Sequence, residues 1–341
     1  MERRGIQLVT TTSWHLGASR AQTRLSAHIV ELNREVNTLL RYILGATSLK
    51  LFSSSTQAKR LYRALGNTLG ARKRVKGKMP NFYLERVNRF LRLNREYGIV
   101  KDGDTLIELG TGWMHWEAVT TKLFFDVEAV LFDIWDNRQF AGLQNYIRQL
   151  SNLLDKCDAE IRQRDRARAL TRSILGVKSF DELYDLLDFE YVVDESGKLD
   201  RFENASFDAV LSASVLEHVI IETLPEYVGA FYRILKPGGY SVHTIDLQDH
   251  LYYYDRSVSP KQYLAFSDSL WKRWFENGIQ YFNRVQPSEW HELFGCAHLD
   301  LVEETRTRTE LPGLTVDKKY AHLEEADVSC AVLYFVHRKP E

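Results

Sequence analysis

The stretch Thr105-Leu-Ile-Glu-Leu-Gly-Thr-Gly112 decides the fold of this chain. Its first five residues are mostly apolar, as in a strand buried in a parallel sheet between helices. Gly110 and Gly112 follow, and glycine permits a tight turn and a close approach of the backbone to a ligand. The stretch therefore predicts a strand, a ligand-binding loop and a helix that begins near Trp116. An ordinary strand-turn-helix junction is the alternative.

Three further segments follow in the order expected of an α/β sheet. The segment 129–133 is a short apolar strand that ends on Asp133, about twenty residues after the glycine turn, where an acid can accept both hydroxyls of a ribose. The segment 206–218 runs from a strand into small residues and a helix start. The segment 231–239 is a helix ended by Pro-Gly-Gly before another strand. Asp133 is the leading ribose ligand, with Asp136 in reserve.

This ordered set resembles the class I S-adenosylmethionine-dependent methyltransferases that act on small molecules, over about residues 97–246. The resemblance implies a Rossmann-like α/β sheet of parallel strands with an antiparallel seventh strand, and S-adenosyl-L-methionine as the cofactor. It implies a set of cofactor-binding residues, which are Glu108, Gly110, Thr111 and Gly112 in the loop, Asp133 at the ribose, Asp194 or Glu195 near the adenine, and Ser212 where the strand passes the cofactor.

The glycine loop departs from two known patterns. The third glycine of the dinucleotide pattern G-x-G-x-x-G is replaced by His115, which makes a nicotinamide dehydrogenase the weakest rival. Many methyltransferase relatives have a third glycine where this chain has Met114. A thioether can line a cofactor site or fill the core, and the sequence leaves both open.

The C-terminal region continues the expected order. The segment 290–302 reads as a helix, a turn and the sixth strand, with Gly295 as the predicted end of the helix. The segment 329–336 supplies the antiparallel seventh strand.

Composition indicates a large protein with one main domain. The chain has 341 residues, of which 44% are hydrophobic and 27% charged, enough for a full core. No apolar run approaches the ~18 residues of a membrane span, and no signal-peptide core follows Met1. The three cysteines have no C-x-x-C pairing, so neither a disulfide framework nor structural zinc is expected. We therefore predict a cytoplasmic protein, with peripheral association at the inner membrane surface as an extension.

We expect two parts in the chain. Residues 1–96 form a basic helical N-terminal extension, and residues 97–341 form the methyltransferase domain, with helical insertions at about 155–188 and 251–288. The first insertion covers the cofactor site, supports oligomerisation or simply faces solvent.

The extension carries a strongly basic segment, residues 59–95. Its Lys and Arg residues are Lys59, Arg60, Arg63, Arg72, Lys73, Arg74, Lys76, Lys78, Arg86, Arg89, Arg92 and Arg95, against Glu85 alone. Such a segment is a solvated helical face, a contact for an anionic membrane surface, or a binding site for RNA. No nucleic-acid module supports the last reading, so nucleic acid is an unlikely partner.

Acceptor chemistry is expected just after the fifth strand, since ligands of open α/β sheets bind at the carboxyl ends of the strands. His250 is the first choice for the general base, with Asp246 or Asp249 to orient it. His218 is a second candidate, and His243 is expected to pack beside the sheet. The alternative use of Asp246, Asp249 and His250 is a magnesium-like site, but we predict no metal.

The aromatic segment 257–284 predicts a cap that recognises the acceptor. The predicted substrate-binding residues are His218, Tyr253, Trp271, Asn283 and Arg284; packing in a helix core is the alternative for the tryptophan. The pattern also looks like that of uncharacterised bacterial methyltransferases associated with polysaccharide synthesis.

The sequence thus predicts O-methylation of a sugar or other small polar acceptor, possibly lipid- or nucleotide-linked. N- or C-methylation is the enzymatic alternative, and a cofactor-binding scaffold without catalysis is the alternative of another class. The oligomeric state is open.

Overall fold

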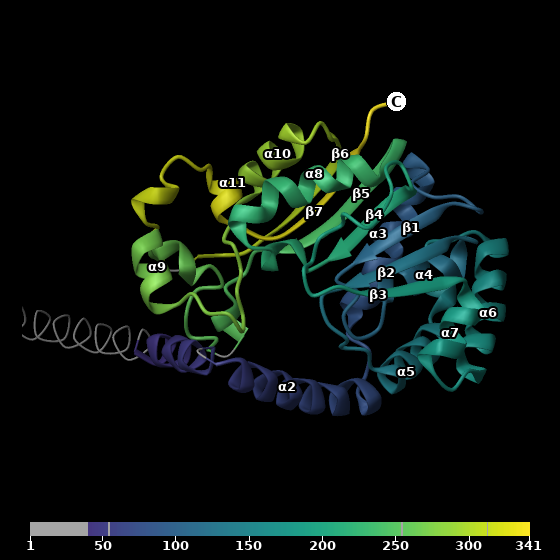
Figure 1. The fold of residues 1–341 in the computed structure, drawn as a ribbon, viewed down its shortest axis with the longest axis horizontal. Helices are drawn as coiled ribbons and strands as arrows, with labels where there is room; N and C mark the ends of the chain where they lie inside the picture. Colours follow the sequence, from purple (N-terminus) through teal and green to yellow (C-terminus); the bar gives the residue numbers. More distant parts are fainter. Residues whose placement is uncertain (1–39, 54, 254, 312) are drawn as a thin grey trace, which may run out of the picture.

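The computed structural model describes residues 40–341 except 54, 254 and 312, and in α2 it leaves out the side chains at 60, 62–64, 66 and 69. Seven strands form one sheet in the order β3-β2-β1-β4-β5-β7-β6 (Figure 1). The strands are β1 (Thr105–Leu109), β2 (Glu128–Asp133), β3 (Phe189–Val193), β4 (Phe207–Ala213), β5 (Leu235–Asp246), β6 (Asp300–Arg308) and β7 (Cys330–Arg338). Only β7 runs antiparallel to its neighbours, which confirms the predicted Rossmann-like sheet.

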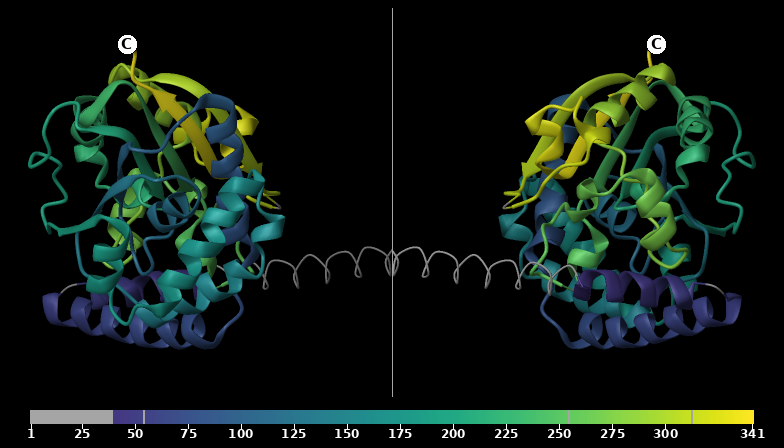
Figure 2. Two further views of the ribbon diagram at one scale, coloured as in Figure 1. Left: turned by 90° about the vertical axis from the view of Figure 1, so that its right-hand side faces the viewer. Right: turned by 90° about the vertical axis from the view of Figure 1, so that its left-hand side faces the viewer.

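Helices cover both faces of the sheet (Figures 1 and 2). One face packs against α3 (Asn81–Tyr97), α4 (Trp116–Phe124) and α5 (Phe140–Ser151), and the other against α8 (Leu224–Ile234) and α10 (Pro287–Cys296). The faces alternate along β1, because Leu106 belongs to the first core and Ile107 to the second. The helix α4 begins at Trp116 as predicted, whereas Gly295 lies inside α10 and does not end it.

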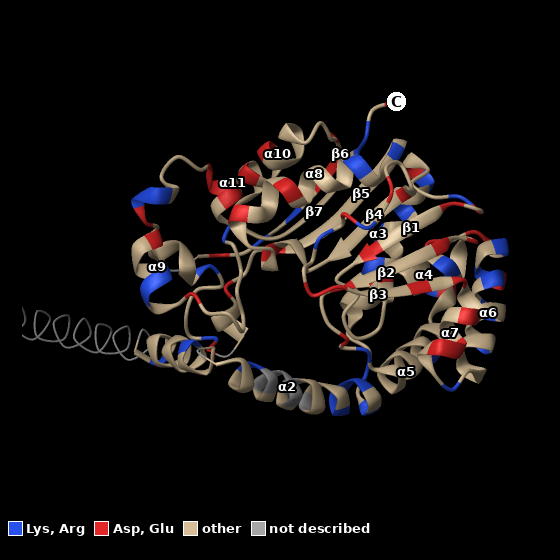
Figure 3. Ribbon diagram, viewed as in Figure 1, with Lys and Arg blue, Asp and Glu red and all other residues tan. Residues whose placement is uncertain are grey.

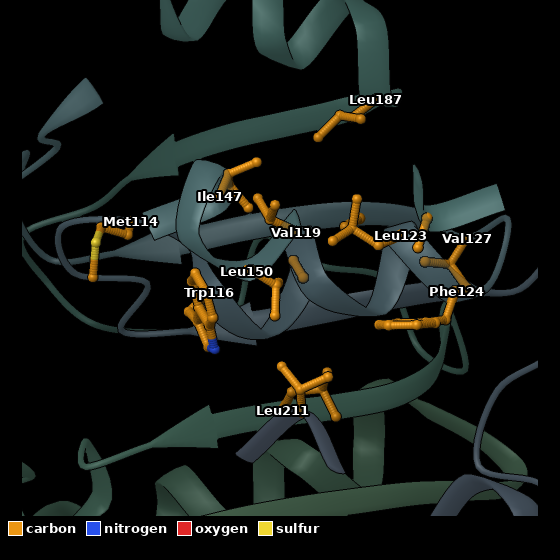
Figure 4. Packing of buried hydrophobic residues seen from close by; sticks show 14 of the residues in the cluster. Met114, Trp116, Val119, Leu123, Phe124, Val127, Ile147, Leu150, Leu187 and Leu211 are labelled. Atoms are coloured by element: carbon orange, nitrogen blue, oxygen red, sulfur yellow. The ribbon is translucent and has the colours of Figure 1, made fainter. Parts of the chain in front are cut away.

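Met114 lies on the loop before α4 (Figure 4) and belongs to the first core. Its side chain is buried together with Trp116 and Val119, and this is the core-filling use of a thioether that the sequence left open.

The first insertion is helical, as expected. It consists of η1 (Leu154–Lys156), α6 (Ile161–Gly176) and α7 (Phe180–Leu187). Ala167 and Ile174 of α6 are fully buried in the first core, so this helix is part of the packed body rather than a solvent-facing addition.

A third core joins the start of the described chain to the segment after β5. Tyr42 and Ala46, on the helix 40–52, pack with Tyr263, Trp271 and Phe282. The remaining elements of this region are η4 (His250–Tyr253), η5 (Gln262–Ala265), α9 (Asp268–Trp274), η6 (Lys318–Tyr320) and α11 (Glu325–Val328). Residues 40–52 therefore belong structurally to the cap.

The helix α2 (Thr56–Lys76) follows and lies along the margin of the molecule, where it packs against α5 (Figures 1 and 2). No helix among the residues that the structure describes is long and apolar enough to cross a membrane. The cysteines at 157, 296 and 330 are free thiols. The predicted helices before residue 40 lie outside the described residues.

Candidate active site

The glycine loop follows β1 at the carboxyl edge of the sheet, beside β2 and β4. Gly110 and Gly112 have φ of 61° and 58°, a conformation that side chains rarely adopt. A Cβ on Gly110 would stand 2.5 Å from Cγ2 of Val215. Glycine is therefore required at position 110, because the turn after β4 leaves no room for a side chain.

Asp133 connects this loop to the end of β2. Its Oδ2 accepts the N–H of Gly112 at 2.8 Å and its Oδ1 accepts the N–H of Ile134 at 2.8 Å. Burial raises the pKa of the Asp133 carboxyl. The carboxylate retains acceptor capacity, since each oxygen can accept two hydrogen bonds, so it can still hold a ribose hydroxyl. The reserve residue Asp136 is instead paired with Arg138.

Two predicted cofactor residues point elsewhere. Glu108 is buried on the α4 side of the sheet, where its Oε2 accepts the N–H of Ala118 at 2.7 Å. Ser212 is buried on the opposite face, and its Oγ lies 2.7 Å from Nδ1 of His243. Because successive side chains of a strand point to opposite faces of the sheet, both side chains lie between the sheet and its covering helices and not at the edge where the loop lies. This geometry corrects both assignments and confirms that His243 packs beside the sheet.

Thr111 and the turn after β3 remain suited to a nucleoside cofactor. Oγ1 of Thr111 is buried and has no hydrogen-bond partner among the described residues. Asp194 follows β3, and its N–H donates to the Asp133 carbonyl at 2.9 Å. Glu195 beside it is exposed. An unpartnered hydroxyl, a glycine turn and a carboxylate with spare acceptor capacity together fit S-adenosylmethionine.

Other elements hold the loop from outside. His115 is fully buried in a left-handed conformation with φ of 50°, and its Nε2 lies 2.8 Å from the Tyr184 hydroxyl of α7. Burial lowers the pKa of His115 to about 3. From α2, Asn67 accepts the indole N–H of Trp113 at 3.1 Å, and the Arg74 guanidinium lies 3.7 Å from the Trp113 ring centroid. A cover over the cofactor site was one alternative for the first insertion, which contains α7, but the sequence did not reveal the contact from α2.

The predicted catalytic group does not assemble as expected. Asp249 is fully buried, its Oδ2 accepts the Tyr42 hydroxyl at 2.6 Å, and its Oδ1 accepts the N–H of Leu251 at 2.9 Å. Burial raises the pKa of Asp249 to about 6. This carboxylate anchors the helix 40–52, so its predicted role in orienting His250 is corrected.

His250 lies among rings. Its centroid is 4.9 Å from that of His218 and 4.6 Å from that of Phe282. Asp246 accepts the Tyr253 hydroxyl and the N–H of Gln248. Among the residues that the structure describes, neither Asp246 nor Asp249 bonds to the His250 ring. Burial lowers the pKa of His250 to about 3, so the ring is neutral but weakly basic.

Glu217 is the residue that the sequence analysis missed. It lies in η2 (Leu216–His218), just after β4, and is 2% exposed. Its Oε1 accepts the N–H of Asp246 at 3.1 Å, while Oε2 is buried and without a partner among the described residues. Burial, and then the charge of Asp246, raise the pKa of Glu217 well above its usual value. The available signal was the pair Glu217-His218 directly after a strand.

Three predicted substrate residues turn out to hold the cap together. Trp271 is buried in the third core. Nδ2 of Asn283 donates to the carbonyl of Leu216 at 2.8 Å, and its own N–H donates to the carbonyl of Glu217 at 2.8 Å. Arg284 is buried and pairs with Asp268. These contacts correct the three assignments, since packing or hydrogen bonding within the cap already engages each side chain.

Tyr253 and His218 remain at the surface of the site. Tyr253 is 45% exposed, and Nδ1 of His218 lies 2.7 Å from the carbonyl oxygen of Tyr281. Within residues 40–341 as described, no three His, Cys, Asp or Glu side chains are arranged to hold a metal ion. The three residues of the metal alternative have separate contacts: Asp246 bonds to Tyr253 and Gln248, Asp249 bonds to Tyr42 and Leu251, and His250 packs against the rings of His218 and Phe282.

Comparisons with known proteins give one family match. Residues 156–243, which include β3, β4 and most of β5, match the model of a methyltransferase domain. A search of the curated proteins found no significant match.

Similar solved structures are distant. They include a SAM-dependent methyltransferase of Methanosarcina mazei, at 12% identity over 72% of this chain and 97% of that chain, with a TM-score of 0.41. Another is the 1,6-didemethyltoxoflavin-N1-methyltransferase of Burkholderia thailandensis, at 15% identity over 76% of this chain and 79% of that chain, with a TM-score of 0.39. A third is phosphoethanolamine N-methyltransferase 2 of Haemonchus contortus, at 16% identity over 81% of this chain and 58% of that chain, with a TM-score of 0.42. At these scores the likenesses carry no functional argument.

Proposed function

We propose that this chain, an S-adenosylmethionine-dependent methyltransferase with the class I fold, methylates an oxygen of a sugar or of another small polar acceptor, free or linked to a lipid or nucleotide. The observation that carries the proposal is the unpartnered Oε2 of buried Glu217, at the carboxyl end of β4 beside the glycine loop. A hydroxyl must lose its proton during transfer, whereas an amine needs no strong base.

The cofactor supplies a methyl group on a sulfonium, which already carries its leaving group. The residues of this chain align the acceptor and receive its proton. Gly110, Thr111, Gly112 and Asp133 hold the cofactor, and Asp194 with Glu195 borders the adenine side. His218 and Tyr253 contact the acceptor.

We assign the proton to Glu217 or His250. A raised pKa makes a carboxylate a stronger base, while the pKa of about 3 makes His250 a weak one. Glu217 is therefore the preferred proton acceptor, and His250 shapes the acceptor site with Phe282. Polysaccharide synthesis is the proposed setting, with the basic segment at an anionic membrane surface.

The test begins with calorimetric titration of S-adenosylhomocysteine. Transfer of labelled methyl is then measured on nucleotide-linked and lipid-linked sugars, and the methylated atom is located by mass spectrometry and NMR. Methyl found only on nitrogen or carbon would refute O-methylation. Cofactor binding without transfer to any acceptor would favour the scaffold.

A further inference from the structure

The basic segment 59–95 divides into two halves in the structure. The half on α3 is engaged with the body of the protein, because three of its arginines form ion pairs there and the fourth stacks on an aromatic ring. These contacts are Arg86 with Glu117, Arg92 with Glu303, Arg95 with Asp158, and Arg89 over the ring of Tyr334. The α3 half is therefore not an open charged surface.

The rest of the basic segment, together with the helix 40–52 before it, has no such compensation. Residues 40–84 contain ten Lys or Arg and no Asp or Glu. Arg41, Arg72, Lys73 and Lys76 are exposed, and among the described side chains none of the four forms an ion pair. Figure 3 shows α2 with Lys and Arg but without Asp or Glu. Arg60 and Arg63 lie outside the described side chains.

On α2, exposed apolar residues share a face with the cationic side chains of Arg72 and Lys76. Leu61 and Leu65 are 59% and 56% exposed. At 3.6 residues per turn, Leu61, Leu65, Arg72 and Lys76 fall within about 60° of one another around the helix. Asn67, which contacts the cofactor loop, projects from the opposite side. The helix thus docks by one face and presents leucine and basic side chains on the other.

The helix 40–52 is divided in the same way. Tyr42 and Ala46 are buried in the third core, while Leu40 and Leu44 are 52% and 59% exposed. Figures 1 and 2 both place this helix beside α2 along the same margin of the molecule.

We propose that these exposed faces form one lipid face that binds the interface of an anionic bilayer, with Leu40, Leu44, Leu61, Leu65, Arg72 and Lys76 in contact. Interfacial binding requires apolar side chains that insert at the acyl boundary, here leucines, and cationic side chains that contact lipid phosphates, here Arg and Lys. The lipid face rests on the membrane contact of the proposed function, but not on methyl transfer or on the acceptor.

The test is flotation of the purified full chain with two kinds of vesicle, phosphatidylcholine alone and phosphatidylcholine mixed with phosphatidylglycerol. Binding is expected only to the anionic vesicles and is weakened by raised salt. The Arg72→Gln/Lys76→Gln variant is expected to bind about 25-fold more weakly, at about fivefold per charge. The control Arg162→Gln/Arg172→Gln removes two exposed arginines of α6 and should leave binding unchanged.

A second pair of variants separates lipid from other polyanions. Leu61→Gln/Leu65→Gln should weaken vesicle binding at least about tenfold, whereas Ile161→Gln/Leu186→Gln, which alters exposed apolar residues of α6 and α7, should not. Loss with the basic variant alone, together with binding to single-stranded RNA, would overturn the proposal in favour of an RNA contact.

Two further results would also overturn it. One is absence of flotation of the wild type, and the other is an equal loss in the controls. Titration of S-adenosylhomocysteine on the same preparations reports on the cofactor site separately, so failure of the lipid face and failure of the proposed enzyme are distinguishable.

Discussion

Two loop clusters lie at the same edge of the sheet but are built in different ways. The cofactor cluster comes mainly from one continuous segment, 110–135, in which glycine conformation and Asp133 set the backbone. The acceptor cluster combines η2, η4 and Asn283, and Asp249 within it is held by Tyr42 from about 200 residues earlier. A motif predicts the first cluster, while only long-range packing assembles the second.

Two buried carboxyls show the same difference. Glu108 and Glu217 both have a raised pKa because both are buried. Oε2 of Glu108 accepts the N–H of Ala118, whereas Oε2 of Glu217 has no partner among the described residues. Burial alone therefore does not mark a catalytic carboxyl, and the unsatisfied oxygen is the informative feature.

The largest expected effect is on the cofactor cluster. Gly110→Arg should reduce the affinity for S-adenosylhomocysteine at least about 100-fold, because a side chain there collides with Val215 in a left-handed backbone. Calorimetric titration measures the change. Gly176→Arg is the control, since a Cβ at Gly176 meets nothing within 4 Å. Normal binding by the Gly110 variant would show that the loop is only structural.

On the acceptor cluster, Glu217→Gln should lower turnover about 100-fold or more and leave cofactor affinity within about twofold. The amide keeps the shape of the side chain but cannot take a proton. Initial rates on the acceptor found in the screen provide the measurement. His250→Ala should have the smaller effect on turnover; a greater loss with His250→Ala would return the base to His250.

The same variant has a signature in stability that needs no acceptor. Because the pKa of Glu217 is raised in the folded state, its protonated form stabilises the fold below the pKa of an unfolded Glu, and this contribution is lost as pH rises through the raised pKa. Glu217→Gln should therefore gain stability relative to the wild type between about pH 5 and pH 8. Urea unfolding at both pH values measures this, and a constant difference would contradict the raised pKa.

Asp133→Ala should weaken binding of S-adenosylhomocysteine about tenfold to 100-fold, because it removes the ribose acceptor and frees the N–H groups of Gly112 and Ile134. Calorimetry again gives the affinity. Asp136→Ala tests the reserve residue, and its expected effect is small because Asp136 is occupied by Arg138. The reverse order would transfer the ribose role to Asp136.

The smallest effect concerns the link between the N-terminal helix and the cap. Tyr42→Phe should cost about 1–3 kcal/mol of unfolding free energy, since it removes the hydroxyl that donates to Oδ2 of the buried Asp249 carboxylate. Denaturant unfolding measures the loss. Tyr253→Phe removes a hydroxyl bond to Asp246 from a residue that is 45% exposed, and it should cost less. Equal costs would mean that residues 40–52 are not part of the cap.

The sequence by itself determined the sheet and the cofactor loop. Apolar strand segments, glycines that need a left-handed backbone, and an acid at the end of β2 are local features, so their positions along the chain predict their positions in space. Position 115, where the dinucleotide pattern has its third glycine, also keeps the backbone of a glycine, because His115 adopts the left-handed conformation.

Only the tertiary structure decided which side chains are already engaged inside the protein and which keep an unused polar atom. Trp271, Asn283 and Arg284 have the chemistry of ligand-binding residues, but packing of the cap engages each of them inside the protein. In the sequence Glu217 is visible only as part of the pair Glu217-His218 after a strand, and what distinguishes it is a buried Oε2 without a partner among the described residues. Residue type sets what a side chain can bind, whereas contacts between distant segments set whether that capacity is already used.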